Sequence, residues 1–257
     1  MAAGEPNEVQ VRLRCFGELE IARPDGTDVA PIFVLPRRAA LFLYLALADP
    51  PAPRPRRELA EMFWPFLVSG TARHTLDQSL FCLHQYLGEI WEAVDDAIVL
   101  VRDPIWCDVW AFREAIASGE LERAAALYRG PLLERPGLFG AGDFQAWLEV
   151  ERERLRRTAL EAAARLAQRA AESGDWPAAA RRLKDAARAE PLDEANLRCL
   201  MVALVQSGDR ASALRAYELL RRRLLLRHGR EPDRESAALA HVIRAGATPP
   251  LEPFLPF

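Results

Sequence analysis

The chain has 257 residues, of which 50% are hydrophobic and 28% are charged, and its formal net charge at pH 7 is −3. The length allows two ordinary domains, and the composition is that of a globular protein rather than a disordered one. The sequence has no apolar run of the roughly 18 residues that span a bilayer and no secretory signal profile at its start, and its net charge disfavours indiscriminate polyanion binding. We therefore expect a cytoplasmic protein with no membrane partner.

The cysteines give no sign of a metal or redox centre. Cys15, Cys82, Cys107 and Cys199 lie far apart, form no CxxC pair and have no histidine at ligand spacing. We expect four reduced thiols that pack as small hydrophobic side chains. The sequence therefore predicts no metal site and no cofactor.

The first part of the chain predicts strands and a turn. Apolar and polar residues alternate from Val9 to Ile21, and Gly17 interrupts the alternation, so we expect two short strands. Asp25 and Gly26 predict a turn after them. The apolar segment Pro31–Leu35 predicts a third short strand.

Two helices are predicted next, and arginines gather before the second. Pro36 opens a helix that is apolar on most sides, so we expect it to be buried. Arg37 and Arg38 lie in its first turn, where they either face solvent or lie near an anion such as phosphate. Residues 50–55 are rich in proline and predict a stiff, extended loop before a short helix over Glu58–Trp64. Three arginines stand at this junction: Arg54, Arg56 and Arg57.

A third helix is predicted over Ala72–Leu87. Ser69 and Thr71 are candidate N-caps, and Gly88 is the residue that ends the helix. Four leucines form one apolar stripe at i, i+4, i+7 and i+11: Leu76, Leu80, Leu83 and Leu87. The opposite face carries Arg73, His74, Asp77, Gln78, Phe81, His84 and Gln85. Arginine, glutamine and histidine can contact base edges or phosphates in a major groove, whereas aspartate and phenylalanine cannot do so in this way.

The segment after this helix predicts a β-hairpin. Apolar residues flank Asp95 and Asp96 within residues 91–101, and residues 102–104 close the unit. Strands, three helices and a hairpin within about a hundred residues are typical of a winged helix, in one domain of ordinary size. In that fold the third helix exposes one face and the hairpin forms the wing.

From Trp106 onward the apolar period becomes helical, and we predict no further strand. The predicted helices are Cys107–Ser118, Leu121–Tyr128, Asp143–Glu172, Asp193–Gln206, Arg210–His228 and a last helix from Pro232 to about Arg244. The sequence Ser-Gly-Asp at 173–175 recurs at 207–209, a spacing of 34 residues, and Ala179 aligns with Ala213. This period is that of the tetratricopeptide repeat, in which small residues let paired helices approach closely.

Several stretches, in the same order along nearly the whole chain, resemble the SARP-type (antibiotic-regulatory-protein) bacterial transcriptional activators. They are VRLRCFGELEI, LPRRAALFLYLAL, RRELAEMFWP, ARHTLDQSLFCLHQYLG, CDVWAFREAIASGELERAAALYRGPLLE, FQAWLEVERERLRRTALEAAARLA, SGDW, and SGDRASALRAYELLRRRL with GREPDRE after it. The resemblance implies a mainly α fold with a small β part. An OmpR-type winged-helix DNA-binding domain over residues 1–105 precedes an all-α, tetratricopeptide-like bacterial transcriptional activator domain over residues 106–246, and residues 247–257 form a proline-rich tail.

The resemblance also implies a function. Members of the family bind direct repeats near promoters as dimers and recruit RNA polymerase; the third helix enters the major groove, the wing touches the minor groove, and the helical domain supports dimer and polymerase contacts. The expected partners are double-stranded DNA, a second copy of the chain and RNA polymerase, with no small-molecule ligand. The candidate DNA-binding residues are Arg54, Arg56, Arg57, Arg73, His74, Gln78, His84 and Gln85.

Two hypotheses follow from the third helix. Asp77 and His84 occupy positions at which the family typically carries basic residues, and Arg73 is the one permanent positive charge on this helix. Either the chain reads an unusual DNA site through its glutamines and histidines, or the winged helix binds DNA weakly and the chain is a protein-interaction module, as an exposed Phe81 would favour. An enzyme is not expected, because the sequence contains no glycine-rich phosphate loop, no HExxH and no Gly-x-Ser-x-Gly motif.

Overall fold

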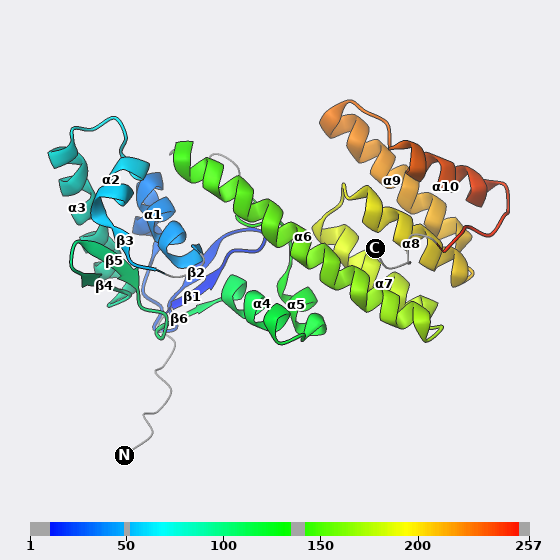
Figure 1. The fold of residues 1–257 in the computed structure, drawn as a ribbon, viewed down its shortest axis with the longest axis horizontal. Helices are drawn as coiled ribbons and strands as arrows, with labels where there is room; N and C mark the ends of the chain where they lie inside the picture. The colour runs from blue at the N-terminus through cyan, green and yellow to red at the C-terminus, as the bar shows by residue number, and fades with distance from the viewer. Residues whose placement is uncertain (1–10, 49–51, 135–141, 252–257) are drawn as a thin grey trace, which may run out of the picture. The chain divides into compact units, whose positions relative to one another are not determined.

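The computed structural model describes residues 11–48, 52–134 and 142–251, which form two compact units (Figure 1). The first unit contains residues up to Glu114 together with Leu132–Glu153, and the second contains Ala115–Pro131 and the residues from Arg154 onward. The fold class is mainly helical with small sheets near the N-terminus, as the sequence predicts. No helix of the described residues is both long enough and apolar enough to cross a membrane.

A three-stranded sheet begins the first unit, in the order β2-β1-β6. The strands β1 (Val11–Arg14) and β2 (Glu20–Ala22) are antiparallel, which confirms the predicted pair; Val9 itself lies outside the described residues. The third strand, β6 (Ile105–Cys107), runs parallel to β1. The prediction of no strand after Trp106 was therefore wrong, because three residues are too few to show a period of two and their partner strand is distant in sequence.

The next segment forms a turn and then a short 3₁₀ helix. Gly26, with φ of 78°, donates its N–H to the carbonyl oxygen of Arg23, which confirms the predicted turn. The strand predicted over Pro31–Leu35 is wrong, because residues Ala30–Val34 form a 3₁₀ helix, η1. The side chain of Asp28 accepts a hydrogen bond from the N–H of Ala30 at 2.8 Å and starts this turn. A short apolar run does not by itself distinguish a strand from a helix.

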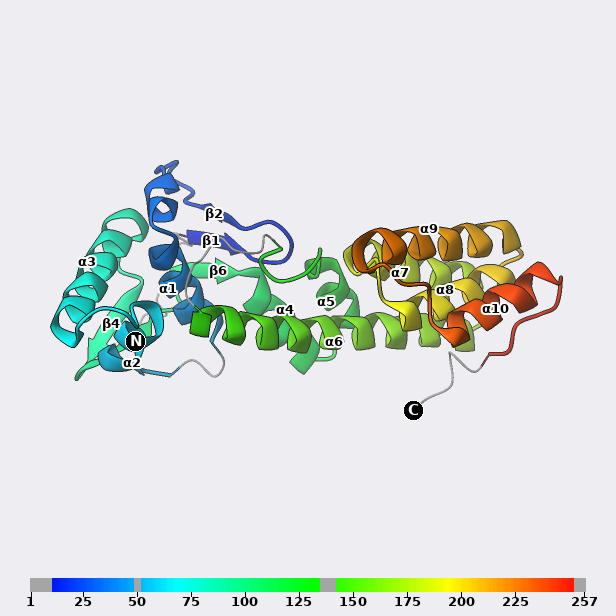
Figure 2. The same cartoon turned by 90° about the horizontal axis from the view of Figure 1, so that it is seen from above.

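Three helices and a hairpin complete the winged helix. The helices are α1 (Pro36–Leu47), α2 (Arg56–Phe63) and α3 (Ser69–Leu87), each close to its predicted range. The predicted hairpin is confirmed as β4 (Trp91–Val94) and β5 (Ala97–Leu100), with Asp95 in the turn at φ of 52°. The two-residue strand β3 (Arg54–Pro55) extends this sheet in the order β3-β5-β4. Both views place the hairpin beside α3 (Figures 1 and 2).

Aromatic side chains close the core of the first unit. The first turns of α6 (Gly142–Glu172) contribute Phe144, whose ring centroid lies 5.8 Å from that of Phe63, and Trp147, which lies 5.0 Å from Tyr44. Trp110, in α4 (Asp108–Ala117), donates its indole N–H to the carbonyl oxygen of Ala46 at 2.7 Å. These contacts bury the apolar side of α1 predicted by its composition.

The second unit is built of paired helices. They are α5 (Leu121–Leu127), α7 (Trp176–Ala189), α8 (Glu194–Gln206), α9 (Arg210–His228) and α10 (Arg234–Arg244), with the later turns of α6. The predicted range of α9 agrees with the observed range at both ends. The last helix starts two residues later than predicted, at Arg234, because Asp233 caps it.

The 34-residue repeat appears in the backbone hydrogen bonds. Gly174 and Gly208, with φ of 77° and 84°, each donate to a carbonyl at 2.9 Å, and the aspartate after each donates at 2.8 Å to the carbonyl five residues earlier. Ala179 and Ala213 are fully buried in one shared core. The repeat therefore reflects two equivalent helix–turn–helix units, with small residues where the helices pack.

Candidate nucleic-acid interface

The buried face of α3 fixes which side chains reach solvent. Leu76, Leu80, Leu83 and Leu87 are all buried, as their spacing predicts. The opposite face presents His74, Gln78, Phe81 and Gln85 along one exposed stripe, with Arg73, Asp77 and His84 beside it. The helix therefore offers a polar, solvent-exposed face of the kind that can enter a DNA groove.

The C-terminal end of α3 agrees with the prediction, and its N-terminal end does not. Gly88 ends the helix with φ of 81°, a conformation that favours glycine, and donates its N–H to the carbonyl of His84 at 2.9 Å. The predicted N-caps Ser69 and Thr71 are wrong, because Val68 is the N-cap residue and has no side-chain cap; the helix begins at Ser69, three residues before the predicted start at Ala72. The first N–H groups of α3 are thus left to solvent or to a ligand.

Arg73 is bound to the wing. Its guanidinium donates two hydrogen bonds to the carboxylate of Asp96 in the hairpin turn, at 3.2 Å from Nη1 to Oδ2 and 2.5 Å from Nη2 to Oδ1. Both side chains are more than half exposed, at 54% and 59%. An ion pair so exposed contributes about 0–1 kcal/mol, so a phosphate group can compete for the arginine.

Arg56 is held more firmly than Arg73. Its guanidinium donates to the carboxylate of Asp77 on α3, and its backbone N–H donates to the carbonyl of Asp96 at 2.9 Å. The Arg56 side chain is only 16% exposed. Asp77 therefore compensates a half-buried guanidinium and joins α2 to α3, a role that the sequence did not indicate.

The other two arginines of the junction differ in exposure. Arg57 is mostly exposed and donates to Glu61 at 2.8 Å, one turn later in α2; this hydrogen bond raises the pKa of Arg57 above its usual range. Arg54 is half-buried, with its guanidinium 5.6 Å from the centroid of the Tyr44 ring. Arg57 is thus placed for a ligand in solvent, whereas Arg54 is part of the packing.

The two arginines in the predicted first turn of α1 are both half-buried. Arg38 donates to the carbonyl oxygen of Pro31 at 3.3 Å, in the 3₁₀ helix that precedes α1. This contact ties the start of α1 to η1, and neither arginine is fully solvated.

The uncharged polar residues of α3 make local contacts. The ring Nε2 of His74 lies 3.0 Å from the side-chain nitrogen of Gln78, one turn later. The ring of His84 lies edge-on to Trp91 at the start of β4, with centroids 6.5 Å apart. Gln85 is exposed. His74, Gln78 and Gln85 therefore remain accessible as hydrogen-bonding groups.

The structure gathers four charged residues around the tip of the wing: Arg56, Arg73, Asp77 and Asp96. We call them the Arg–Asp cluster. Its two cations and two anions sum to zero formal charge, so the positive charge that the arginines predict is locally balanced. Asp96 was not among the predicted site residues; its place in a tight turn after a strand did not reveal which arginine it would contact.

Comparisons with known proteins place this fold. Residues 108–244 match the model of the bacterial transcriptional activator domain. No curated protein matches the chain. Among solved structures, the chain is similar to Mycobacterium tuberculosis EmbR in complex with a low-affinity phosphopeptide, with a TM-score of 0.58 and 21% identity over 95% of this chain and 67% of that chain. At this identity the likeness shows the fold alone.

The family match extends over more than half of the chain, from the first residue of α4 to the last residue of α10. It agrees with the resemblance found in the sequence and with the paired helices of the second unit. The chain belongs to the bacterial transcriptional activator domain family, a family of transcriptional regulators.

Proposed function

We propose that the chain is a sequence-specific DNA-binding regulator, an activator that reads promoter-proximal repeats with α3. The observation that supports this most is the exposed polar face of α3, with His74, Gln78 and Gln85 beside the β4–β5 wing. Glutamine can bond adenine at two atoms, and histidine can donate to or accept from a base edge. In this proposal residues 1–105 form the DNA-binding domain and residues 106–246 contact a dimer mate or RNA polymerase.

In this proposal, the carboxylate partners of the exposed arginines limit the strength of DNA binding. Arg57 and Arg73 are exposed cations on α2 and α3, and each already has a carboxylate partner. If each neutralises one phosphate, log affinity falls with log salt at a slope of about −2, since one phosphate contributes about −0.9. We therefore propose weak electrostatic attraction and a large share of specificity from base contacts.

The alternative is a protein-interaction module with a winged helix that binds DNA weakly or not at all. Phe66 and Phe81 favour it, because they are 90% and 62% exposed, the former in the α2–α3 loop and the latter on the polar face of α3. An aromatic side chain in solvent is characteristic of a surface that another protein covers.

Fluorescence anisotropy of the full-length protein with labelled duplex DNA tests the proposal. The duplex comes from upstream of the chain's own operon, and a shuffled duplex of equal composition measures non-specific binding. We expect a clear preference for the upstream duplex. Equal affinity for both duplexes across the salt range would favour the interaction module instead.

The substitution Arg73→Glu tests the proposed interface. We expect it to weaken specific binding about tenfold or more and to flatten the salt slope by about one unit. The matched control is Arg188→Glu, at another exposed arginine that is paired with an aspartate, in α7. An equal loss for both variants, or no loss for Arg73→Glu, would contradict the assignment of α3.

A further inference from the structure

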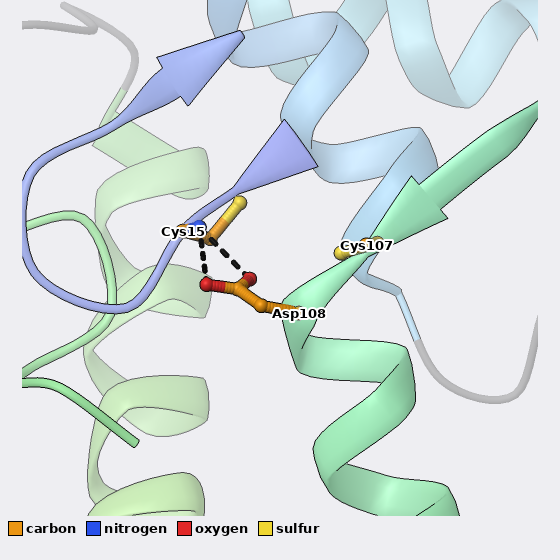
Figure 3. A group of neighbouring side chains, drawn as sticks. All are labelled: Cys15, Cys107 and Asp108. Atoms are coloured by element: carbon orange, nitrogen blue, oxygen red, sulfur yellow. Dashed lines mark hydrogen bonds between the residues drawn. The ribbon is translucent and has the colours of Figure 1, made fainter. Parts of the chain in front are cut away.

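Two cysteines that are 92 residues apart in sequence, Cys15 and Cys107, lie close together at the ends of β1 and β6 (Figure 3). In the parallel pair of β1 and β6, Cys107 is the partner of Leu13. Side chains alternate along a strand, so Cys15, two residues after Leu13, projects to the same face of the sheet as Leu13 and Cys107. Cys15 is 0% exposed and Cys107 is 1% exposed.

A buried carboxylate completes this group. Asp108 follows Cys107 directly, begins α4 and is 2% exposed. Its Oδ1 accepts the N–H of Cys15 at 2.9 Å, and its Oδ2 accepts the same N–H at 3.1 Å (Figure 3). Oδ2 also accepts the N–H of Phe16 at 3.2 Å. The two sulfur atoms and a carboxylate oxygen all lie within 4.8 Å of one another.

These distances suit donors around one cation. With metal–sulfur bonds of about 2.3 Å and metal–oxygen bonds of about 2.0–2.2 Å, neighbouring ligand atoms of a tetrahedral zinc site lie roughly 3.5–3.8 Å apart. The backbone N–H groups of Cys15 and Phe16 orient the carboxylate, as outer hydrogen bonds do for the ligating carboxylates of metal sites.

The strand register disfavours a disulfide between the same two cysteines. Cys15 is offset by two residues from the partner of Cys107. Strands lie about 4.8 Å apart and rise about 3.3 Å per residue, so extended backbone separates the two Cα atoms by roughly 8 Å. A disulfide needs Cα atoms no more than about 7 Å apart. A cation between the sulfur atoms spans the gap without moving the strands.

We propose that Cys15, Cys107 and Asp108 form a binding site for a thiophilic divalent cation of the zinc type. Two thiolates and one carboxylate supply three ligands. The bound cation joins the end of β1, the end of β6 and the start of α4. This inference is independent of DNA binding, because none of the three residues lies on α3 or on the wing.

The test uses the full-length protein, stripped of metal with a chelator and kept reduced, and titrated with Cd²⁺ as a spectroscopic stand-in for Zn²⁺. We expect an ultraviolet thiolate-to-cadmium charge-transfer band that saturates at one ion per chain and that Zn²⁺ displaces. We also expect the melting temperature to rise with the free concentration of either ion, because a cation that binds only the folded state stabilises it.

Four variants separate this site from the other thiols. Cys107→Ser and Cys107→Ala should abolish both the band and the melting shift, whereas Cys82→Ser and Cys199→Ser, at thiols on α3 and α8, should keep both. Far-ultraviolet circular dichroism of the metal-free variants shows whether each remains folded. If Cys107→Ser does not fold, Cys107→Ala replaces it in the titration. No band in the wild type, or a band that survives in a folded Cys107 variant, would overturn the proposal.

A fifth variant tests the carboxylate. Asp108→Asn retains an oxygen that can accept the N–H of Cys15 but removes the charged ligand. We expect it to keep the thiolate band and to bind Cd²⁺ at least tenfold more weakly. Unchanged affinity would remove Asp108 from the ligand set and overturn the three-ligand site.

Discussion

The helices of the two compact units begin in different ways. In the second unit, α7, α8, α9 and α10 each start after an aspartate whose side chain accepts the N–H three residues further on: Asp175, Asp193, Asp209 and Asp233. In the first unit, α1, α2 and α3 start after Leu35, Pro55 and Val68, and none has a side-chain cap. These four helices of the second unit therefore have a local start signal, which α5, after Glu120, lacks. The helices α1, α2 and α3 instead rely on contacts between distant segments.

This difference also concerns the proposed interface. In the first unit, polar contacts between distant segments replace side-chain caps. The backbone N–H of Arg56, at the start of α2, donates to the carbonyl oxygen of Asp96 in the wing. The side chain of Asp77 on α3 accepts a hydrogen bond from the guanidinium of Arg56. The residues proposed to face DNA thus belong to the network that joins α2, α3 and the wing. A change at this surface alters both charge and packing.

The largest effect is expected from a core residue of α3. Leu80 is 1% exposed, and because α3 has no side-chain cap, packing supplies its stability. We expect Leu80→Ala to lower the free energy of unfolding by about 3 kcal/mol. Urea unfolding followed by circular dichroism measures this, with Leu219→Ala, at a half-exposed leucine of α9, as the matched control expected to cost less than about 0.5 kcal/mol. Equal costs would show that packing does not dominate in α3.

A smaller effect is expected from a cap in the second unit. The carboxylate of Asp193 accepts the N–H of Asn196 at 2.7 Å and the guanidinium of Arg156 at 2.9 Å. We expect Asp193→Ala to cost about 1–2 kcal/mol, measured by the same unfolding experiment. Asp193→Asn keeps the capping oxygen and should cost clearly less. If the asparagine variant were as unstable as the alanine variant, the cap would not be what stabilises α8.

The smallest effect is a gain in stability. Val68 stands at the N-cap position of α3 with extended backbone angles, φ −60° and ψ 139°, and its side chain is exposed. Serine fits this position and can accept an N–H of the first turn, so Val68→Ser should stabilise the protein by about 0.5–1 kcal/mol. The control is Val150→Ser, at an exposed valine inside α6, where the backbone N–H groups already bond within the helix and a serine cannot cap it. A gain of equal size in the control would contradict this account of α3.

The same contrast explains what the sequence could predict. The range of α9 and the paired glycine turns of the repeat follow from local signals, namely an aspartate cap, a glycine in the left-handed region and a 34-residue period. The strand β6 was missed because it depends on pairing with the distant β1. The 3₁₀ helix η1 was predicted as a strand because a short apolar run does not distinguish the two, and the side-chain contact of Asp28 lies just before that run.

The candidate interface was predicted in part. The apolar stripe of α3 identified its buried face, and so the exposed face that carries His74, Gln78 and Gln85 followed from helix geometry. The partners of its charges did not follow. In the sequence, Asp77 stood only as an acid where the family typically carries a basic residue, yet in the structure it compensates Arg56. The pairing of Arg73 with Asp96 depends on how the wing folds back beside α3.

The most direct test of the Arg–Asp cluster is the salt dependence of DNA binding by Asp96→Asn. Asp96 competes with phosphate for the exposed Arg73, so the account predicts that removing this charge tightens binding to the upstream duplex at every salt concentration. The salt slope should stay near that of the wild type, because Arg73 already contacts one phosphate in the proposed complex. The control is Asp185→Asn, which removes an aspartate that pairs with the exposed Arg188 on α7 and should change neither quantity. An Asp96→Asn variant with the affinity of the wild type across the salt range would contradict the claim that the wing's own carboxylate limits DNA binding by α3.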